Sequence, residues 1–217
     1  MTDTAEIEFR DYYTEALYMT TDLETGVLYN RSGRRMIALT DDFLIGLHKA
    51  LEAECGEKAD QVLAACGRRW GKNFATGLDD EWSQFYGQPA KNFPAAMFHS
   101  LLVQEFGHNG WGNIQLHYDH FEQGVLWVSL EGAIMSDIYP TRSDRNADVL
   151  TTGILAGIFQ YFFDRDLDCL QTQCSAAGHD LSCFVLSSPA RIDSVRELVT
   201  AGKPHQEVLT HLHQQCG

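Results

Sequence analysis

Three of the six cysteines lie in one short segment, DCLQTQCSAAGHDLSCFVLSSP, at residues 168–189. Cys169, Cys174 and Cys183 could supply thiolates to a structural zinc ion, which takes four Cys or His ligands in tetrahedral geometry. His179 lies between the last two cysteines and is a further candidate ligand. Alternatively, Cys174 and Cys183 could form a pair across a hairpin, reduced or as a disulfide. Free cysteine is also among the most buried residue types, so inert core thiols are the third interpretation.

Large aromatic side chains recur through the middle of the chain and are typical of either a packed core or a lined cavity. Aromatic residues at helical spacing usually pack on each other, whereas ligand sites are mostly apolar with a few polar groups. His99 could be a polar anchor or an axial ligand to a tetrapyrrole magnesium; a hydrogen-bonded, partly buried histidine is the alternative. The candidate ligand-binding residues are Trp70, Phe74, Phe98, His99, Trp111, Trp127, Phe159 and Phe162.

The sequence carries no catalytic motif. It has no Gly-x-Ser-x-Gly elbow, no phosphate-binding loop and no dinucleotide fingerprint. A reductase acting alone would need a hydride-carrying cofactor, and no motif for one is present. The sequence therefore favours a binding protein over an enzyme, with no catalytic residues assigned.

Composition and charge restrict the class of protein further. The 217 residues are 44% apolar and 21% charged, which is typical of a globular domain. A net charge of −14 argues against a nucleic-acid partner, because phosphate binding needs a clustered basic surface. The acidic N-terminus lacks the features of a signal peptide, and no apolar stretch approaches the roughly 20 residues of a spanning helix. We therefore expect a cytoplasmic protein with mostly reduced cysteines.

Hydrophobic periodicity predicts the elements that must position these residues. A hairpin is expected at 27–29 and 35–39, and a second at 114–118 and 125–130. Further strands are expected at 167–174 and 183–187, and helices at 41–51, 58–74, 94–106 and 144–163, with one or two more over 190–215. The second helix is expected to end near Phe74, before an aromatic and acidic segment at 78–86. Gly153 and Gly157, one turn apart, would allow another backbone to approach closely.

The C-terminal pattern resembles the 4-vinyl reductase domain, a small-molecule-binding module related in fold to small subunits of the TRAPP vesicle-tethering complexes. The upstream segment EFGHNGWGNIQLHYD resembles the family's glycine-tryptophan-glycine entry to its first long hairpin. The resemblance covers about residues 26–190 and is greatest to the stand-alone cyanobacterial members. Its C-terminal signature falls on Gly153, Gly157, Cys174, Gly178, Cys183 and Phe184.

This resemblance implies a single α+β domain at 26–217, with an antiparallel sheet packed against a helical layer, preceded by an N-terminal arm at 1–25. It implies an apolar pocket for a hydrophobic molecule such as a chlorophyll-type tetrapyrrole, a carotenoid or a lipid, in photosystem assembly or pigment metabolism. A homodimer, a photosynthetic assembly partner and peripheral membrane association are also expected. The alternatives are a protein-interaction scaffold and an accessory subunit of a vinyl reductase.

The resemblance also bears on the cysteine segment. In relatives such as the phenol sensors, a structural zinc is held by a set that matches Asp148, Gln171, Cys174 and Cys183 here. Only the two cysteines are retained. Asp148 could still ligate as a carboxylate, whereas Gln171 is a poor zinc ligand. Zinc at Asp148, Cys174 and Cys183 is therefore an expectation that needs an altered ligand set.

Overall fold

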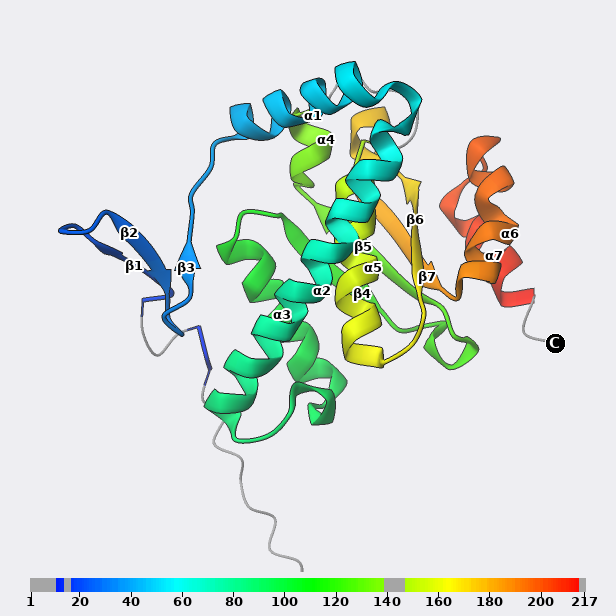
Figure 1. The fold of residues 1–217 in the computed structure, drawn as a ribbon. Helices are drawn as coiled ribbons and strands as arrows, with labels where there is room; N and C mark the ends of the chain where they lie inside the picture. The colour runs from blue at the N-terminus through cyan, green and yellow to red at the C-terminus, as the bar shows by residue number, and fades with distance from the viewer. Residues whose placement is uncertain (1–10, 14–16, 139–146, 215–217) are drawn as a thin grey trace, which may run out of the picture.

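The computed structural model describes residues 11–13, 17–138 and 147–214. Figure 1 shows long helices crossing in front of the main sheet, with the C-terminal helices beyond it. The helices are α1 (Asp41–Cys55), α2 (Ala59–Tyr86), α3 (Ala95–His108), α4 (Ile134–Ile138), α5 (Val149–Phe163), α6 (Pro189–Thr200) and α7 (His205–Gln214). The strands are β1 (Met19–Asp22), β2 (Val27–Asn30), β3 (Arg35–Met36), β4 (Asn113–His117), β5 (Leu126–Glu131), β6 (Asp168–Gln173) and β7 (Ser182–Ser187).

The main sheet has the order β4-β5-β7-β6, and every neighbouring pair is antiparallel. Side chains alternate between its two faces, as strand geometry requires. Val128 and Phe184 point into the main core with α5, whereas Val185 points to a second cluster with α6 and α7. The expected α+β domain with an antiparallel sheet on a helical layer is therefore confirmed, and a second helical layer covers the outer face.

Helices α2 and α5 cross with their backbones in direct contact. An added Cβ at Gly71 would overlap the carbonyl oxygen of Ile154, and one at Gly157 would overlap the carbonyl oxygen of Arg68. Gly67 and Gly153 make equivalent approaches to the opposite helix. The two glycines expected to permit close approach on α5 thus meet two more on α2.

The small sheet β1-β2-β3 lies beside this helical layer (Figure 1). It follows three buried tyrosines, Tyr12, Tyr13 and Tyr18, which belong to the main core cluster. These three tyrosines of the predicted N-terminal arm therefore pack on the body, and β1 pairs with β2 along its whole length. None of the described helices combines the length and the apolar character needed to cross a membrane.

Several element boundaries differ from those predicted from the sequence. The prediction that the second helix ends near Phe74 was wrong, because α2 continues to Tyr86 and ends at Gly87, whose φ of 71° is left-handed. Leu78 and Trp82 continue its buried face, so the acidic residues between them lie on an unbroken helix. Strand β3 has two residues, shorter than expected. The predicted start of α5 at residue 144 lies outside the described residues, within which α5 begins at Val149.

Candidate binding cavity

A cavity of about 500 Å³ opens between the small sheet, α2, α5 and the end of α3. Its walls are mostly apolar, and its charged lining residues are Arg34, Arg35, Glu81 and Glu105. The apolar lining residues are Met36, Ile37, Leu39, Leu44, Trp70, Phe74, Leu78, Trp111, Ile134, Leu150 and Ile154. An apolar hollow with a few polar groups is the usual form of a small-molecule site.

Three of the predicted ligand-binding residues meet in this cavity. Trp70 and Phe74, one turn apart on α2, stack with ring centroids 4.6 Å apart and planes 16° apart. Trp111 reaches the same place from the glycine-rich turn after α3, with its ring centroid 5.3 Å from that of Trp70. Trp70 remains 40% exposed although it is a large aromatic residue. These rings form an aromatic wall with surface available to a ligand.

A buried acidic network also borders the cavity. Glu105 is only 2% exposed. Its carboxylate accepts hydrogen bonds from Tyr13 Oη at 2.5 Å, Tyr18 Oη at 2.8 Å and Asn109 Nδ2 at 2.8 Å. Burial raises the pKa of Glu105 above its ordinary value, and burial beside this carboxylate raises the pKa of Tyr18 as well. The network therefore joins the N-terminal segment to α3.

Glu81 on α2 makes a second, similar group. Its Oε2 accepts a hydrogen bond from Tyr12 Oη at 3.0 Å, and its Oε1 accepts one from Asn30 Nδ2 at 3.0 Å. Neither glutamate was predicted from the sequence as a site residue. The available signal was a glutamate placed four residues after a core leucine, as Glu105 follows Leu101, on the buried face of a helix.

Other predicted site residues lie away from the cavity. Phe98, Phe159 and Phe162 fill the core around Trp82; the centroids of Phe98 and Phe162 are 4.9 Å apart in an edge-to-face contact. They are not among the residues that line the hollow. Their aromatic rings supply packing area instead, which is the more common use of aromatic residues at helical spacing.

His99 and Trp127 are also occupied elsewhere. His99 Nε2 accepts a hydrogen bond from the backbone N–H of Leu116 at 3.2 Å, and burial lowers the pKa of His99. That nitrogen is therefore not directed at a ligand in the cavity. Trp127 lies on the outer face of the sheet, stacked on His117 with centroids 3.5 Å apart and near His205 of α7.

The cysteine segment forms a hydrogen-bonded cluster. Asp148, which is fully buried, accepts hydrogen bonds at Oδ2 from Ser136 Oγ at 2.6 Å, Gln171 Nε2 at 2.7 Å and Ser182 Oγ at 2.9 Å. Cys174 Sγ lies 3.6 Å from Ser136 Oγ. Cys183 and Cys169 are likewise buried, unpaired thiols, and burial raises the pKa of Cys183 to about 11.

The side chains of this cluster are poorly suited as zinc ligands. Asp148 Oδ2 already accepts three hydrogen bonds. Its partners are serine hydroxyls and a glutamine amide, whereas a tetrahedral zinc site needs thiolates or imidazoles. Within 11–13, 17–138 and 147–214, no three His, Cys, Asp or Glu side chains are grouped as metal ligands. A network of hydroxyls and an amide connects α4, α5, β6 and β7 at this point.

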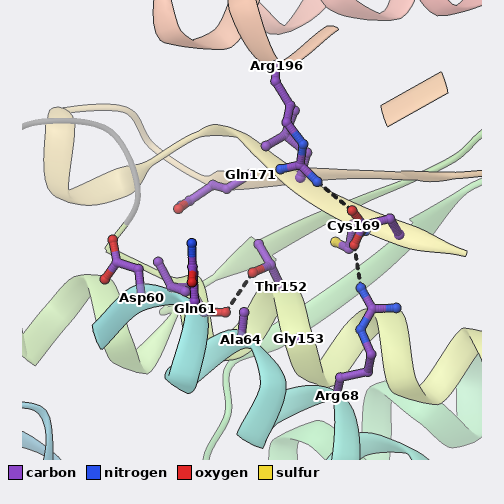
Figure 2. Close-up of a pocket in the computed structure, with 12 residues that line it drawn as sticks. Asp60, Gln61, Ala64, Arg68, Thr152, Gly153, Cys169, Gln171 and Arg196 are labelled. Atoms are coloured by element: carbon purple, nitrogen blue, oxygen red, sulfur yellow. Dashed lines mark hydrogen bonds and ion pairs between the residues drawn. The ribbon is translucent and has the colours of Figure 1, made fainter. Parts of the chain in front are cut away.

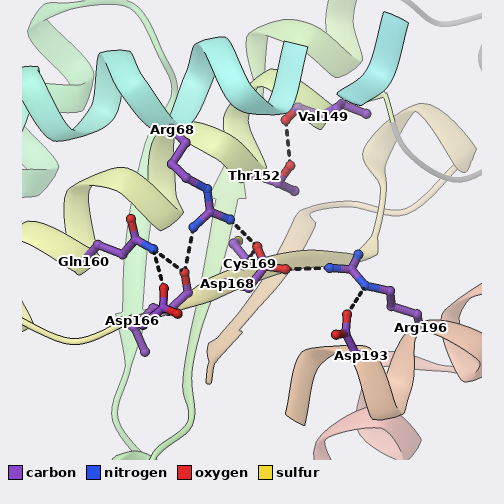
Figure 3. Close-up of polar contacts among 10 residues, drawn as sticks. Arg68, Val149, Thr152, Gln160, Asp166, Asp168, Cys169, Asp193 and Arg196 are labelled. Carbon is purple, nitrogen blue, oxygen red and sulfur yellow. Dashed lines mark hydrogen bonds and ion pairs between the residues drawn. The ribbon is translucent and has the colours of Figure 1, made fainter. Parts of the chain in front are cut away.

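A second hollow, of about 400 Å³, lies between α2, α5 and β6 and is more polar (Figure 2). Arg68 of α2 and Arg196 of α6 both point at the carboxylate of Asp168 on β6 (Figure 3). Arg196 also pairs with Asp193 at 2.8 Å. Because two acids compensate two guanidinium groups, we interpret this arrangement as an ionic clamp between three elements rather than as a ligand site.

No protein-family model matches the sequence, and no curated protein matches it either. Among solved structures, the phenol-responsive sensory domain of the transcription activator PoxR, determined with phenol, matches with a TM-score of 0.64 at 14% identity. The match covers 86% of this chain and 92% of that domain. The chain has the fold of this sensory domain.

Two further structures match over a shorter part of the chain. Subunit 3 of a trafficking protein particle complex from Naegleria fowleri, covalently bound to palmitic acid, gives a TM-score of 0.50 at 14% identity, covering 68% of this chain and 93% of that one. A vinyl-4-reductase family protein from Methanocaldococcus jannaschii gives 0.47 at 13% identity, covering 70% and 83%. At these identities the likeness concerns the fold alone.

Proposed function

We propose that the protein binds a hydrophobic or amphiphilic small molecule in the cavity between α2, α5 and the small sheet, and that it does so without catalysis. The observation that carries this proposal is the cavity itself, with its partly exposed aromatic wall of Trp70, Phe74 and Trp111. Its volume of about 500 Å³ falls within the roughly 300–1,000 Å³ of typical ligand sites.

The ligands of the similar folds support this class of function. The PoxR domain was determined with phenol and the Naegleria subunit with palmitic acid, so this fold accommodates both a small aromatic and a long acyl chain. A chlorophyll-type tetrapyrrole, a carotenoid or a lipid is the finer proposal, serving photosystem assembly or pigment metabolism. Cys66 lines the same cavity, so intact mass measurement would also reveal a ligand attached through its thiol.

The direct experiment is to extract the natively purified protein with organic solvent and to record absorbance and mass spectra of the extract. A pigment or lipid at near-stoichiometric amount would support the proposal. Complete absence of a bound molecule, together with no binding of phenol, a fatty acid or a chlorophyll-type tetrapyrrole above background, would contradict it.

Trp70→Ala is expected to weaken binding of an identified ligand about tenfold, because removing a stacked aromatic wall eliminates an apolar contact of roughly 1–2 kcal/mol. The matched control is Trp127→Ala, which removes the same side chain from the outer face of the sheet and should leave affinity within about twofold. Titration calorimetry on both variants measures the difference. Equal losses in the two variants would show that the ligand does not contact Trp70.

We also propose that the Asp148 cluster holds the β6–β7 hairpin without zinc. Protein purified without added metal is expected to contain less than about a tenth of an equivalent of zinc, and a chelator should leave its melting temperature unchanged. Ser182→Ala should cost about 1–2 kcal/mol of unfolding free energy, because it removes a donor from the buried carboxyl group. Stoichiometric zinc by elemental analysis would contradict the proposal.

A second candidate function, as an interaction scaffold or homodimer, is favoured by one surface. On α1, Phe43 is 51% exposed and Leu47 is 45% exposed, and Ile37 and Leu39 lie exposed just before that helix. Apolar surface of this kind often marks an interface. The mass of the protein in solution, with and without Phe43→Ser and Leu47→Ser, tests whether these residues join two copies.

Turnover of a divinyl tetrapyrrole with a reductant would instead indicate a role in vinyl reduction.

A further inference from the structure

Two arginines stand at one side of the binding cavity. Arg34 and Arg35 follow the turn at Gly33, whose φ is 81°, and lead into the short strand β3. Both line the cavity and both are exposed. They bring two positive charges to an apolar hollow in a chain whose net charge is −14.

The Arg34 guanidinium lies directly against helix α2 at Gly77. A Cβ added at Gly77 would overlap Arg34 Nη1 and would lie 3.0 Å from Arg34 Cζ. Glycine in a helix interior is about 1 kcal/mol less favourable than alanine. Here the absence of a Cβ leaves the space that the guanidinium occupies, so Arg34 packs against the backbone of α2 beside the cavity.

The carboxylates of Glu81 and Glu105 accept hydrogen bonds from neighbouring side chains, whereas Arg34 and Arg35 have no acceptor among the described residues. Glu105 accepts from two tyrosines and Asn109, and Glu81 accepts from Tyr12 and Asn30. Throughout the part of the chain that the structure describes, no acceptor or ion-pair partner is found for the guanidinium of Arg34 or Arg35. An unpaired guanidinium beside an apolar cavity is suited to a carboxylate, to which it donates short, charge-assisted hydrogen bonds.

We propose that the ligand is an amphiphilic carboxylic acid. Its carboxylate pairs with Arg34, with Arg35 adjacent, and its apolar body lies along Trp70 and Phe74. This inference rests on the proposed function and specifies the chemical class of the ligand for the same cavity. Such a site differs from a general hydrophobic site because its ligand must carry an anionic head group.

The test compares three probes of equal chain length: dodecanoate, dodecanol and dodecylamine. Affinities are measured by calorimetry at pH 7.5, below the micelle-forming concentration of each probe. Wild-type protein is expected to bind dodecanoate about tenfold more tightly than dodecanol, the increment of one charge-assisted hydrogen-bonded pair, and dodecylamine most weakly. Raising the salt concentration should weaken the binding of dodecanoate more than that of dodecanol, because salt screens exposed charges.

Two variants test separately the charge of Arg34 and its contact with Gly77. Arg34→Gln should lower dodecanoate affinity about tenfold and leave dodecanol affinity within about twofold. Gly77→Ala keeps the charge but displaces the guanidinium, and should reproduce the same selective loss. The control is Arg69→Gln, which removes an exposed arginine of α2 that does not line the cavity and should leave all three affinities unchanged.

The possible outcomes separate the inference from the function on which it rests. If dodecanol binds as tightly as dodecanoate, or if Arg34→Gln weakens both probes equally, the ligand is not recognised as an acid and the inference is wrong, while apolar binding stands. If none of the three probes binds and the native extract holds no ligand, the proposed function itself fails. Circular dichroism of each variant confirms that it is folded.

Discussion

Alanine at Gly71 or at Gly157 is expected to lower the free energy of unfolding by about 3 kcal/mol, at the upper end of the cost of overpacking a well-packed core. At each position the new Cβ would overlap a backbone carbonyl oxygen of the opposite helix. A carbonyl within a helix cannot rotate away as a side chain can, so α2 and α5 must move apart. Urea unfolding followed by circular dichroism measures the loss.

The matched control is Gly46→Ala in α1. Gly46 is exposed, and a Cβ there meets no atom within 4 Å. This substitution should stabilise the protein by up to about 1 kcal/mol through helix propensity alone. The double variant Gly71→Ala/Gly157→Ala should cost less than the sum of the single variants, because separation of the helices relieves both overlaps. Single variants as stable as Gly46→Ala would show that the helices do not cross at this distance.

The second large loss of stability is expected when Glu105 is substituted. Glu105→Ala should cost about 3–5 kcal/mol, because it leaves the buried donors of Tyr13, Tyr18 and Asn109 without their acceptor, at roughly 1–3 kcal/mol for each buried group left unpaired. The exposed Glu54 on α1 is the control, and Glu54→Ala should change stability by no more than about 0.5 kcal/mol. Because Tyr13 and Tyr18 precede the small sheet, Glu105→Ala should also make the N-terminal segment more sensitive to protease.

Glu105 also predicts a pH dependence of stability. Burial raises its pKa above the ordinary value of 4.5, so the folded state binds this proton more tightly than the unfolded state does. The contribution of this proton to the free energy of unfolding is fully present below about pH 4.5. It is lost as the pH rises through the pKa of Glu105 in the folded state. The Glu105→Gln side chain cannot ionise. The unfolding free energy of the wild type, measured relative to Glu105→Gln, should therefore fall as the pH rises from about 4.5; an increase would contradict this.

Much of the fold could be predicted from local pattern. Alternating apolar residues located the strands of the main sheet, and the glycine pair of α5 indicated a close approach. The partners Gly67 and Gly71 were not predicted, although they have the same one-turn spacing as Gly153 and Gly157, because the spacing alone does not show which helix packs against the pair on α5. The end of α2 was also misplaced. Acidic residues after Phe74 suggest a turn, but on the long helix Asp80 lies on the solvated face and Glu81 on the buried face.

The cavity was harder to predict than the fold. Aromatic residues at helical spacing can either fill a core or line a hollow, and sequence does not distinguish the two. Trp70 and Phe98 are alike in pattern, yet Trp70 lines the cavity and Phe98 is packed against Phe162. The polar side of the cavity depends on Glu105 and Tyr13, which are 92 positions apart in the chain. Such pairings arise only from the tertiary arrangement.

The crossing of α2 and α5 has a consequence for ligand selection. One wall of the cavity is built on these two helices, and their backbones already touch where Gly71 meets Ile154. That wall cannot yield, because closer approach or sliding would bring carbonyl groups into overlap. Another part of the lining comes from the two-residue strand β3 and the exposed Ile37 and Leu39. Any adaptation to ligands of different width should therefore occur in β3 and the segment that leads into α1.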